Sequence, residues 1–309
     1  MIGTITLNPS IDQHLIVEGL VKDDANRARS AALYPGGKGV NVSKVVRELG
    51  GPTRAYALLA GFVGGFWEEL VTGLDIPYSA VKVCGETRLN TIFTDIKDHT
   101  QTRVSAPGPF TPQKSIDLFL RKLLSARPKP FLWVLGGSLS YGMKPATYFK
   151  FIQALQRNGT PCVLDTDNEA LKLGVEARPF MIKPNEYEMR RLLDRSFKTP
   201  GDYLEGARQL VKRGVKIVVV SLGKNGALFV TDKKALHVLT PHVPVRSKVG
   251  AGDSLIGGFA FGLLKGKSFE EAARLGVAAS ASAVMREAPR LCRRRDIAPL
   301  LGRIALKPL

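Results

Sequence analysis

The chain has 309 residues, of which 44% are hydrophobic and 23% charged, the composition of an ordinary soluble globular protein. No apolar run reaches the roughly 18–20 residues of a membrane-spanning helix, and the first seven residues are typical of a strand rather than of a signal peptide. The three cysteines are widely spaced and lack the spacing of a metal site. We therefore expect a reduced, cytoplasmic protein with no membrane partner.

Lys and Arg number 45 against 27 Asp and Glu, which gives a formal net charge of +18. Such a charge suits nucleic acid, acidic lipid or anionic small molecules. The densest basic run, RLCRRR at residues 290–295, has no interleaved aromatic residues that would stack on bases. A solvated basic surface that also attracts phosphorylated metabolites is favoured, and a non-catalytic nucleic-acid-binding protein is kept as an alternative.

In the first third of the chain, the pattern predicts two short strand pairs that have no helix to cover them. The pairs join residues 14–20 with 27–33 and residues 88–95 with 101–105. We expect them to form a small β-sheet projecting from the main body, with its strands between about residues 12–34 and 87–106. Such a sheet would serve as a lid, as a dimer interface, or as both.

A glycine cluster, PGGKGVNV, occupies residues 35–42 ahead of a helical run over residues 43–49. Glycines before a helix let backbone N–H groups approach an anion, and Lys38 and Asn41 add polar groups. The cluster lacks the spacing of a P-loop. On its own it is more typical of a structural turn.

From about residue 130 onward, strand and helix signals alternate. Apolar runs predict strands at 131–135, 162–164, 180–182 and 217–220. Helical spacing predicts helices at 148–157, from just after the third of these strands to residue 193, and at 203–213. This alternation predicts an α/β fold with a central, mostly parallel sheet flanked by helices, formed as a single domain over residues 1–309.

Polar and glycine residues follow four of these strands. They are Ser138, Asp165, Asn185 and Gly223. Because ligands of such sheets bind beyond the carboxyl ends of the strands, these residues are expected to meet at one binding edge.

The segment VGAGDS at residues 249–254 comes just before a long apolar run that predicts a buried helix. Gly250 and Gly252 allow a tight turn with bare N–H groups at the helix N-terminus, and Asp253 adds a carboxylate to the first turn. An anion cradle beside a base suggests phosphoryl transfer to an alcohol. The segment by itself is equally compatible with an ordinary helix cap.

Taken together, four motifs resemble those of the ribokinase-like (PfkB) carbohydrate kinase family. They are GGKG at residues 36–39, NEYE at 185–188, SLGKNGA at 221–227 and VGAGDS at 249–254. Their order and spacing match that family over nearly the whole chain. The segments at residues 6–12, 26–27, 87–90 and 107–109 are similar to its phosphosugar branch, which includes 1-phosphofructokinase, tagatose-6-phosphate kinase and the minor bacterial 6-phosphofructokinase.

The resemblance implies a ribokinase-like fold and a role for each motif. Asp253 would act as the base on the acceptor hydroxyl, and Gly250, Ala251 and Gly252 would form the anion cradle. The sugar phosphate would be held by Asp12, Arg27, Gly37, Lys38, Asn41, Arg88, Asn90 and Ser138. ATP would be held by Lys183, Asn185, Ser221, Gly223 and Gly226. Mg²⁺ would be positioned, mostly through water, by Asn185, Glu188 and Asp165.

The expected reaction is ATP- and Mg²⁺-dependent phosphorylation of a ketohexose phosphate, with fructose 1-phosphate as the leading acceptor. Fructose 6-phosphate and tagatose 6-phosphate are close alternatives, and an uncharged sugar or nucleoside is a more distant one. We also expect a homodimer that forms through the lid. The chain departs from the family pattern at three places. A Pro-Pro pair is usual at residues 140–141, and small residues are usual at 167–168 and 285–289.

Overall fold

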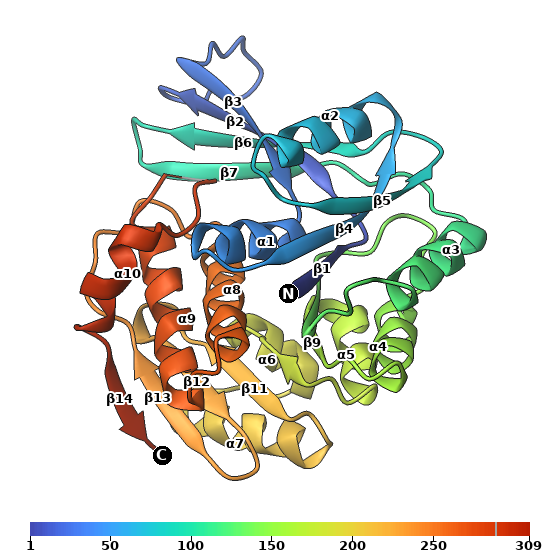
Figure 1. The fold of residues 1–309 in the computed structure, drawn as a ribbon. Coiled ribbons are helices and arrows are strands. Elements are labelled where there is room, and N and C mark those ends of the chain that lie inside the picture. Colours follow the sequence, from blue (N-terminus) through green and yellow to red (C-terminus); the bar gives the residue numbers. More distant parts are fainter. Residues whose placement is uncertain (288) are drawn as a thin grey trace.

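The computed structural model describes residues 1–287 and 289–309, and its central feature is a ten-stranded sheet with the order β14-β13-β12-β11-β10-β9-β8-β1-β4-β5 (Figure 1). Seven neighbouring strands run parallel: β1 (Ile2–Thr6), β4 (Thr53–Ala60), β5 (Tyr78–Val83), β8 (Leu132–Gly136), β9 (Cys162–Asp165), β10 (Met181–Ile182) and β11 (Ile217–Ser221). An antiparallel extension completes the sheet: β12 (Ala227–Val230), β13 (Ala235–Leu239) and β14 (Ala305–Pro308). The predicted α/β fold with a mostly parallel sheet is therefore confirmed.

Helices cover both faces of this sheet. One core contains side chains of α1 (Lys38–Glu48), α8 (Ala251–Leu264), α9 (Phe269–Val284) and α10 (Arg294–Leu301). The core on the other face contains side chains of α3 (Gln113–Leu124), α4 (Thr147–Arg157), α5 (Asn168–Glu176), α6 (Glu186–Leu193) and α7 (Pro200–Lys212). A third, smaller core joins α2 (Gly61–Thr72) to β4 and to the start of the second sheet. None of the helices in the described part of the chain is long and apolar enough to cross a membrane.

The second sheet has four strands in the order β3-β2-β6-β7 and lies beyond α1, at the top of Figure 1. Its strands are β2 (Ser10–Val17), β3 (Ser30–Gly36), β6 (Arg88–Asp95) and β7 (Thr100–Ser105). The predicted pairs β2–β3 and β6–β7 are both present, and a parallel pairing of β2 with β6 joins them into one sheet.

The prediction placed β2 at residues 14–20, whereas the strand begins at Ser10 and ends at Val17. Two contacts explain the difference. Ser10 is paired with Arg88 of β6, so pairing begins almost directly after β1. At the other end, the Asp95 carboxylate accepts the N–H groups of Gly19 and Leu20, which turns the chain out of the ladder.

Candidate active site

The first turn of α8 contains the carboxylate that the sequence singled out. Gly250 is the residue before the helix and has a φ of 76°, a left-handed conformation that favours glycine. A Cβ atom at this position would also lie 2.2 Å from Leu291 Cδ2. Asp253 is only 7% exposed, and its Oδ2 accepts a hydrogen bond of 2.8 Å from Asn41 Nδ2. The two glycine segments, more than 200 residues apart, therefore meet at this bond.

The electrostatic surroundings of Asp253 suit a proton acceptor. Burial disfavours its charged form and raises the pKa of the carboxyl, while the Lys38 ammonium and the Asn41 hydrogen bond oppose this rise. A carboxylate whose pKa lies above its ordinary value is a stronger base than an exposed one.

Three charged side chains surround the other side of the cradle. Asp165, 2% exposed at the end of β9, lies 3.1 Å from the Lys38 ammonium and 3.4 Å from the Lys183 ammonium. A Cβ atom at Gly252 would lie 3.1 Å from Lys183 Nζ, so this ammonium lies beside the N-terminus of α8. Two cations and the helix N-terminus thus form a positive site for phosphoryl oxygens.

The same group of charges governs two pKa values. Burial raises the pKa of the Asp165 carboxyl, but the Lys183 and Lys38 ammonium groups outweigh it, so the pKa lies below its ordinary value. Burial lowers the pKa of Lys38, whereas the neighbouring carboxylates raise it. The carboxylates of Asp165, Asp253 and Glu188 prevail, and the pKa of Lys38 is raised. Asp165 and Lys38 are therefore both charged at neutral pH.

Asn185 and Glu188 form a reciprocal cap at the start of α6. Asn185 Oδ1 accepts the Glu188 N–H, and Glu188 Oε2 accepts the Asn185 N–H. Burial raises the pKa of Glu188, and the Lys183 ammonium opposes this. No group of three or more His, Cys, Asp or Glu side chains able to hold a metal is found among residues 1–287 and 289–309.

These residues nevertheless fit a hydrated Mg²⁺ ion. Glu188 has a second carboxylate oxygen that the cap does not use, and Asp165 Oδ2 is buried with no hydrogen-bond partner among the described residues. Mg²⁺ keeps several of its waters and is usually held by one or two carboxylates together with substrate phosphates. Asp165 itself is ion-paired, so its predicted role as a metal ligand is compatible with contact through water.

The residues predicted to hold the sugar lie where the small sheet meets the main one. Asp12 Oδ1 accepts hydrogen bonds from Asn90 Nδ2 at 2.7 Å and from Ser10 Oγ at 2.8 Å. A Cβ atom at Gly36 would lie 2.5 Å from Asp12 Oδ2, so only glycine leaves that oxygen its space. Next to it, Gly37 has a φ of 123° and starts α1.

Arg88 and Ser138 both contact the segment that contains Asn8. Arg88 donates to the Asn8 carbonyl oxygen at 3.0 Å, and Asn8 Nδ2 donates to Ser138 Oγ at 3.1 Å. Burial lowers the pKa of Arg88, and the positive charge of Arg103 lowers it further. Arg88 Nε is buried and has no partner in the described part of the chain.

Four predicted residues lie apart from this cluster. Arg27 is exposed in the loop between β2 and β3, at the opposite end of β2 from Asp12, so this one chain does not bring it to the other residues predicted to hold the sugar. Ser221 ends β11 and forms a bridge with Asn185, while Gly223 and Gly226 bound the turn that follows. Gly226 has a φ of 85°, and a Cβ atom there would lie 2.0 Å from the Val238 carbonyl oxygen.

Comparison with known proteins decides the family. The model of the pfkB family carbohydrate kinases matches residues 2–295. The chain belongs to the pfkB family of carbohydrate kinases. This pfkB kinase is 33% identical to the 1-phosphofructokinase of Escherichia coli over 99% of its own length and 98% of the relative. It is 32% identical to the ATP-dependent 6-phosphofructokinase isozyme 2 of the same organism, over 96% of each chain.

Solved structures agree with the fold. The structure of E. coli phosphofructokinase-2 in complex with potassium has a TM-score of 0.93 and 31% identity, and covers 97% of this pfkB kinase and 98% of that chain. The same E. coli protein has been solved with fructose 6-phosphate and in a tetrameric inhibited form, each with a TM-score of 0.91. The predicted family and its phosphosugar branch are therefore confirmed.

Sequence reasoning missed Lys44 in this pfkB kinase. Its ammonium donates to Asn41 Oδ1 at 3.2 Å and to the Pro35 carbonyl oxygen. Because an ammonium only donates, it fixes the Asn41 amide with the oxygen toward Lys44 and the nitrogen toward Asp253. Burial lowers the pKa of Lys44 from 10.5 to about 8, against the opposing effects of Asp12 and Asp253. A helical lysine carries no sequence signal of such a role.

Lys44 makes the stability of this pfkB kinase depend on pH. The folded pKa of about 8 lies below the ordinary 10.5, so between these values the unfolded chain binds more protons. The free energy of unfolding should therefore rise with pH across this window, by up to about 3 kcal/mol. Urea denaturation of the wild type and of Lys44→Met at pH 7 and pH 10 measures this. A stability difference between the two proteins that stays the same at both pH values would contradict it.

Proposed function

We propose that the chain transfers the γ-phosphoryl group of ATP to a hydroxyl of a ketohexose phosphate, with fructose 1-phosphate as the leading acceptor and fructose 1,6-bisphosphate as the product. The observation that supports this best is the position of Asp253. It lies in the first turn of α8, is held by Asn41, and has the Lys183 ammonium beside the same helix N-terminus. A base and a positive anion site meet there, as phosphoryl transfer to an alcohol requires.

In the proposed mechanism, Asp253 accepts the proton of the acceptor hydroxyl while that oxygen attacks the γ-phosphorus. The N–H groups of Ala251, Gly252 and Asp253 lie in the first turn of the helix and stabilise the charge on the transferred group. The Ala251 N–H also makes a long contact, of 3.5 Å, with the Lys248 carbonyl oxygen. Lys183 and Lys38 add positive charge on either side. Asp12, fixed by Asn90 and Ser10, accepts hydrogen bonds from the sugar hydroxyls and orients the ring.

We assign ATP to the edge formed by the ends of β10 and β11, with Ser221, Gly223 and Gly226 around the base and ribose and Lys183 and Asn185 toward the phosphates. Glu188 and Asp165 would hold Mg²⁺ through its waters. The bound ion would supply charge neutralisation on the phosphate oxygens. One E. coli relative is named as ATP-dependent, which supports the choice of nucleotide.

The acceptor is inferred from the relatives. Several are named 1-phosphofructokinase, and one is a 6-phosphofructokinase. A coupled assay of ADP release with fructose 1-phosphate, fructose 6-phosphate, tagatose 6-phosphate and free fructose tests the assignment. The highest kcat/KM is expected with fructose 1-phosphate. A preference for free fructose would overturn the phosphosugar proposal.

Arg88→Ala is expected to raise KM for the phosphosugar by about tenfold or more, with a smaller change in kcat. An arginine bonded to a phosphate contributes about 1.5–3 kcal/mol, and the contact is present in both the bound substrate and the transition state. The partly buried Arg88, whose Nε has no partner among the described residues, is placed for that contact. Steady-state kinetics with the preferred phosphosugar gives both constants.

Free fructose is the internal control for Arg88→Ala, because this sugar has no phosphate group for Arg88 to contact. Its KM should change little in Arg88→Ala. Arg29→Ala is a matched variant control, since Arg29 is an exposed arginine of the β2–β3 loop. Equal KM values for the phosphosugar in the wild type and in Arg88→Ala would favour an uncharged acceptor instead.

We also propose that two chains pair through the four-stranded sheet, and that the enzyme works in the cytoplasm, where its three free cysteines would stay reduced. Leu33, Leu89 and Val104 lie on three strands of that sheet and are 40%, 43% and 57% exposed. Light scattering at micromolar concentration should give twice the mass of the chain. The mass of a monomer or a tetramer under those conditions would contradict the dimer.

A further inference from the structure

Arginines from two segments gather around one hollow of about 300 Å³. The hollow is lined by Arg246, Met285, Arg286, Glu287, Arg290 and Arg293. None of its lining residues belongs to the active-site cluster described above, although Leu291, which lies between two of them in the chain, packs against Gly250. A second, more open hollow of about 720 Å³ is lined by Glu48, Arg293, Arg294, Arg295 and Ala298. Arg293 lines both, so the two hollows are neighbours.

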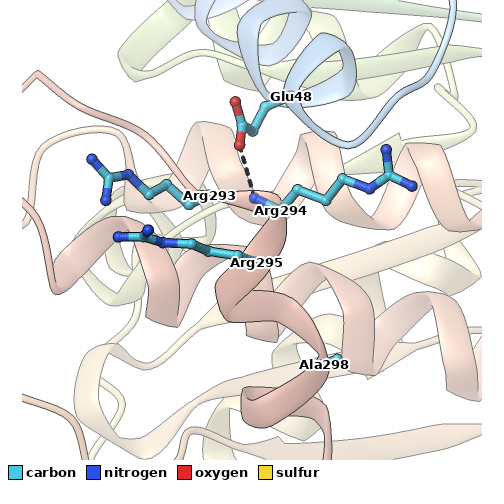
Figure 2. Close-up of a pocket in the computed structure, with 5 residues that line it drawn as sticks. All are labelled: Glu48, Arg293, Arg294, Arg295 and Ala298. Atoms are coloured by element: carbon cyan, nitrogen blue, oxygen red, sulfur yellow. Dashed lines mark hydrogen bonds between the residues drawn. The ribbon is translucent and has the colours of Figure 1, made fainter.

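The charges in this region are poorly compensated. Glu287 pairs with Arg246 at 3.4 Å, and Asp296 lies 4.0 Å from Arg295 Nε. Glu48 Oε1 accepts the backbone N–H of Arg294 (Figure 2). Arg286, Arg290 and Arg293 make no ion pair with any described residue. Figure 2 shows the side chains of Arg293 and Arg295 extending to the same side of the start of α10, away from that of Arg294. Like charges so arranged repel one another unless an anion lies between them.

Arg286 carries the clearest sign of a missing partner. Its Nε is buried without a hydrogen-bond partner among the described residues. Burial lowers the pKa of its guanidinium, and the positive charges of Arg293 and Arg290 lower it further, against the opposing effect of the Asp296 carboxylate. An unsatisfied buried donor of this kind is costly, and an acceptor anion removes the cost.

We propose that these arginines form a second anion site, distinct from the catalytic site, that binds a small molecule bearing two or more phosphate groups. Arginine forks match phosphate oxygens, and several forks around one hollow suit a compact polyphosphate better than an extended strand. The absence of aromatic side chains among the lining residues also argues against stacked bases.

The test is calorimetric titration of the full chain with inorganic tripolyphosphate. The wild type should show a binding event that the double variant Arg290→Glu with Arg293→Glu weakens by about tenfold or more. The matched control is Arg121→Glu with Arg208→Glu, because these exposed arginines of α3 and α7 change the net charge equally and lie on the other face of the sheet. The control should bind as the wild type does. The proposal would be overturned if both double variants bound tripolyphosphate equally weakly, or if both bound it as the wild type does.

Two further measurements separate the site from its alternatives. The KM for ATP should be unchanged in the Arg290/Arg293 double variant. A severalfold rise confined to that variant would show that these arginines belong to the nucleotide site and overturn the proposal. A single-stranded DNA oligonucleotide that binds far more tightly than tripolyphosphate, with steep salt dependence, would also overturn it in favour of nucleic acid. If charge reversal prevents folding, Arg290→Ala with Arg293→Ala takes its place.

Discussion

Asp253→Asn is expected to lower kcat by about a hundredfold or more while the Kd for ATP changes little. The asparagine keeps the shape of the side chain, but its amide is too weak a base to accept the hydroxyl proton as the carboxylate does. ATP makes its contacts through Lys183 and the helix N–H groups in the proposed complex, and the substitution leaves these in place. Coupled ADP release measures kcat, and calorimetry with ATP measures binding. Turnover near that of the wild type would show that Asp253 is not the base.

The same variant should be at least as stable as the wild type. Because burial raises the pKa of Asp253, the charged carboxylate is disfavoured in the folded state at neutral pH, and a neutral side chain avoids this penalty. Urea denaturation therefore distinguishes loss of chemistry from loss of fold. Asp202→Asn is the control, because Asp202 also lies in the first turn of a helix but caps α7 on the surface. Its kcat should stay near that of the wild type.

The sequence predicted the parts of the fold whose signals are local. Buried strands such as β11 and the glycine turns before α1 and α8 need only a few neighbouring residues to be recognised. The start of α1 was nevertheless placed at residue 43 rather than at Lys38, because apolar periodicity marks only the buried face. The parallel pairing of β2 with β6 was not predicted, since it joins residues about 80 positions apart.

The candidate site shows the same division. Its glycines and Asp253 stand in recognisable motifs, and their assigned roles remain predictions. Asn8 was missed because its contact with Ser138 exists only after β1 and β8 have packed side by side. Ser10 and Lys44 make local contacts, with Asp12 two residues on and with Asn41 one helical turn back, but a serine in a strand and a lysine in a helix carry no sequence signal of such a role. The ion pair of Asp165 with Lys38 and Lys183, like the contact of Asn8, exists only in the packed fold. It joins the ends of two neighbouring strands to the start of a helix that is distant in the sequence.

Asp165→Ala is expected to destabilise the fold by about 3–5 kcal/mol, because it leaves the Lys183 ammonium buried without its carboxylate. Lys183 is 5% exposed, whereas the side chain of Lys38 is 35% exposed and water can compensate it. The loss should therefore come mainly from Lys183. A double-mutant cycle with Lys183→Met isolates this coupling by urea denaturation. An Asp165→Ala/Lys183→Met protein no more stable than Asp165→Ala would contradict it.

Acid should have the same effect as this substitution. The folded pKa of Asp165 is lowered, so its contribution is complete above the ordinary pKa of 3.8 and is lost as the pH falls through the folded value. Unfolding free energies of the wild type and Asp165→Ala should consequently converge at low pH. The exposed pair of Arg195 and Glu205, 2.8 Å apart, is the control. Glu205→Gln should change stability far less than Asp165→Ala does, because water screens the exposed pair but not the buried pair of Asp165 and Lys183.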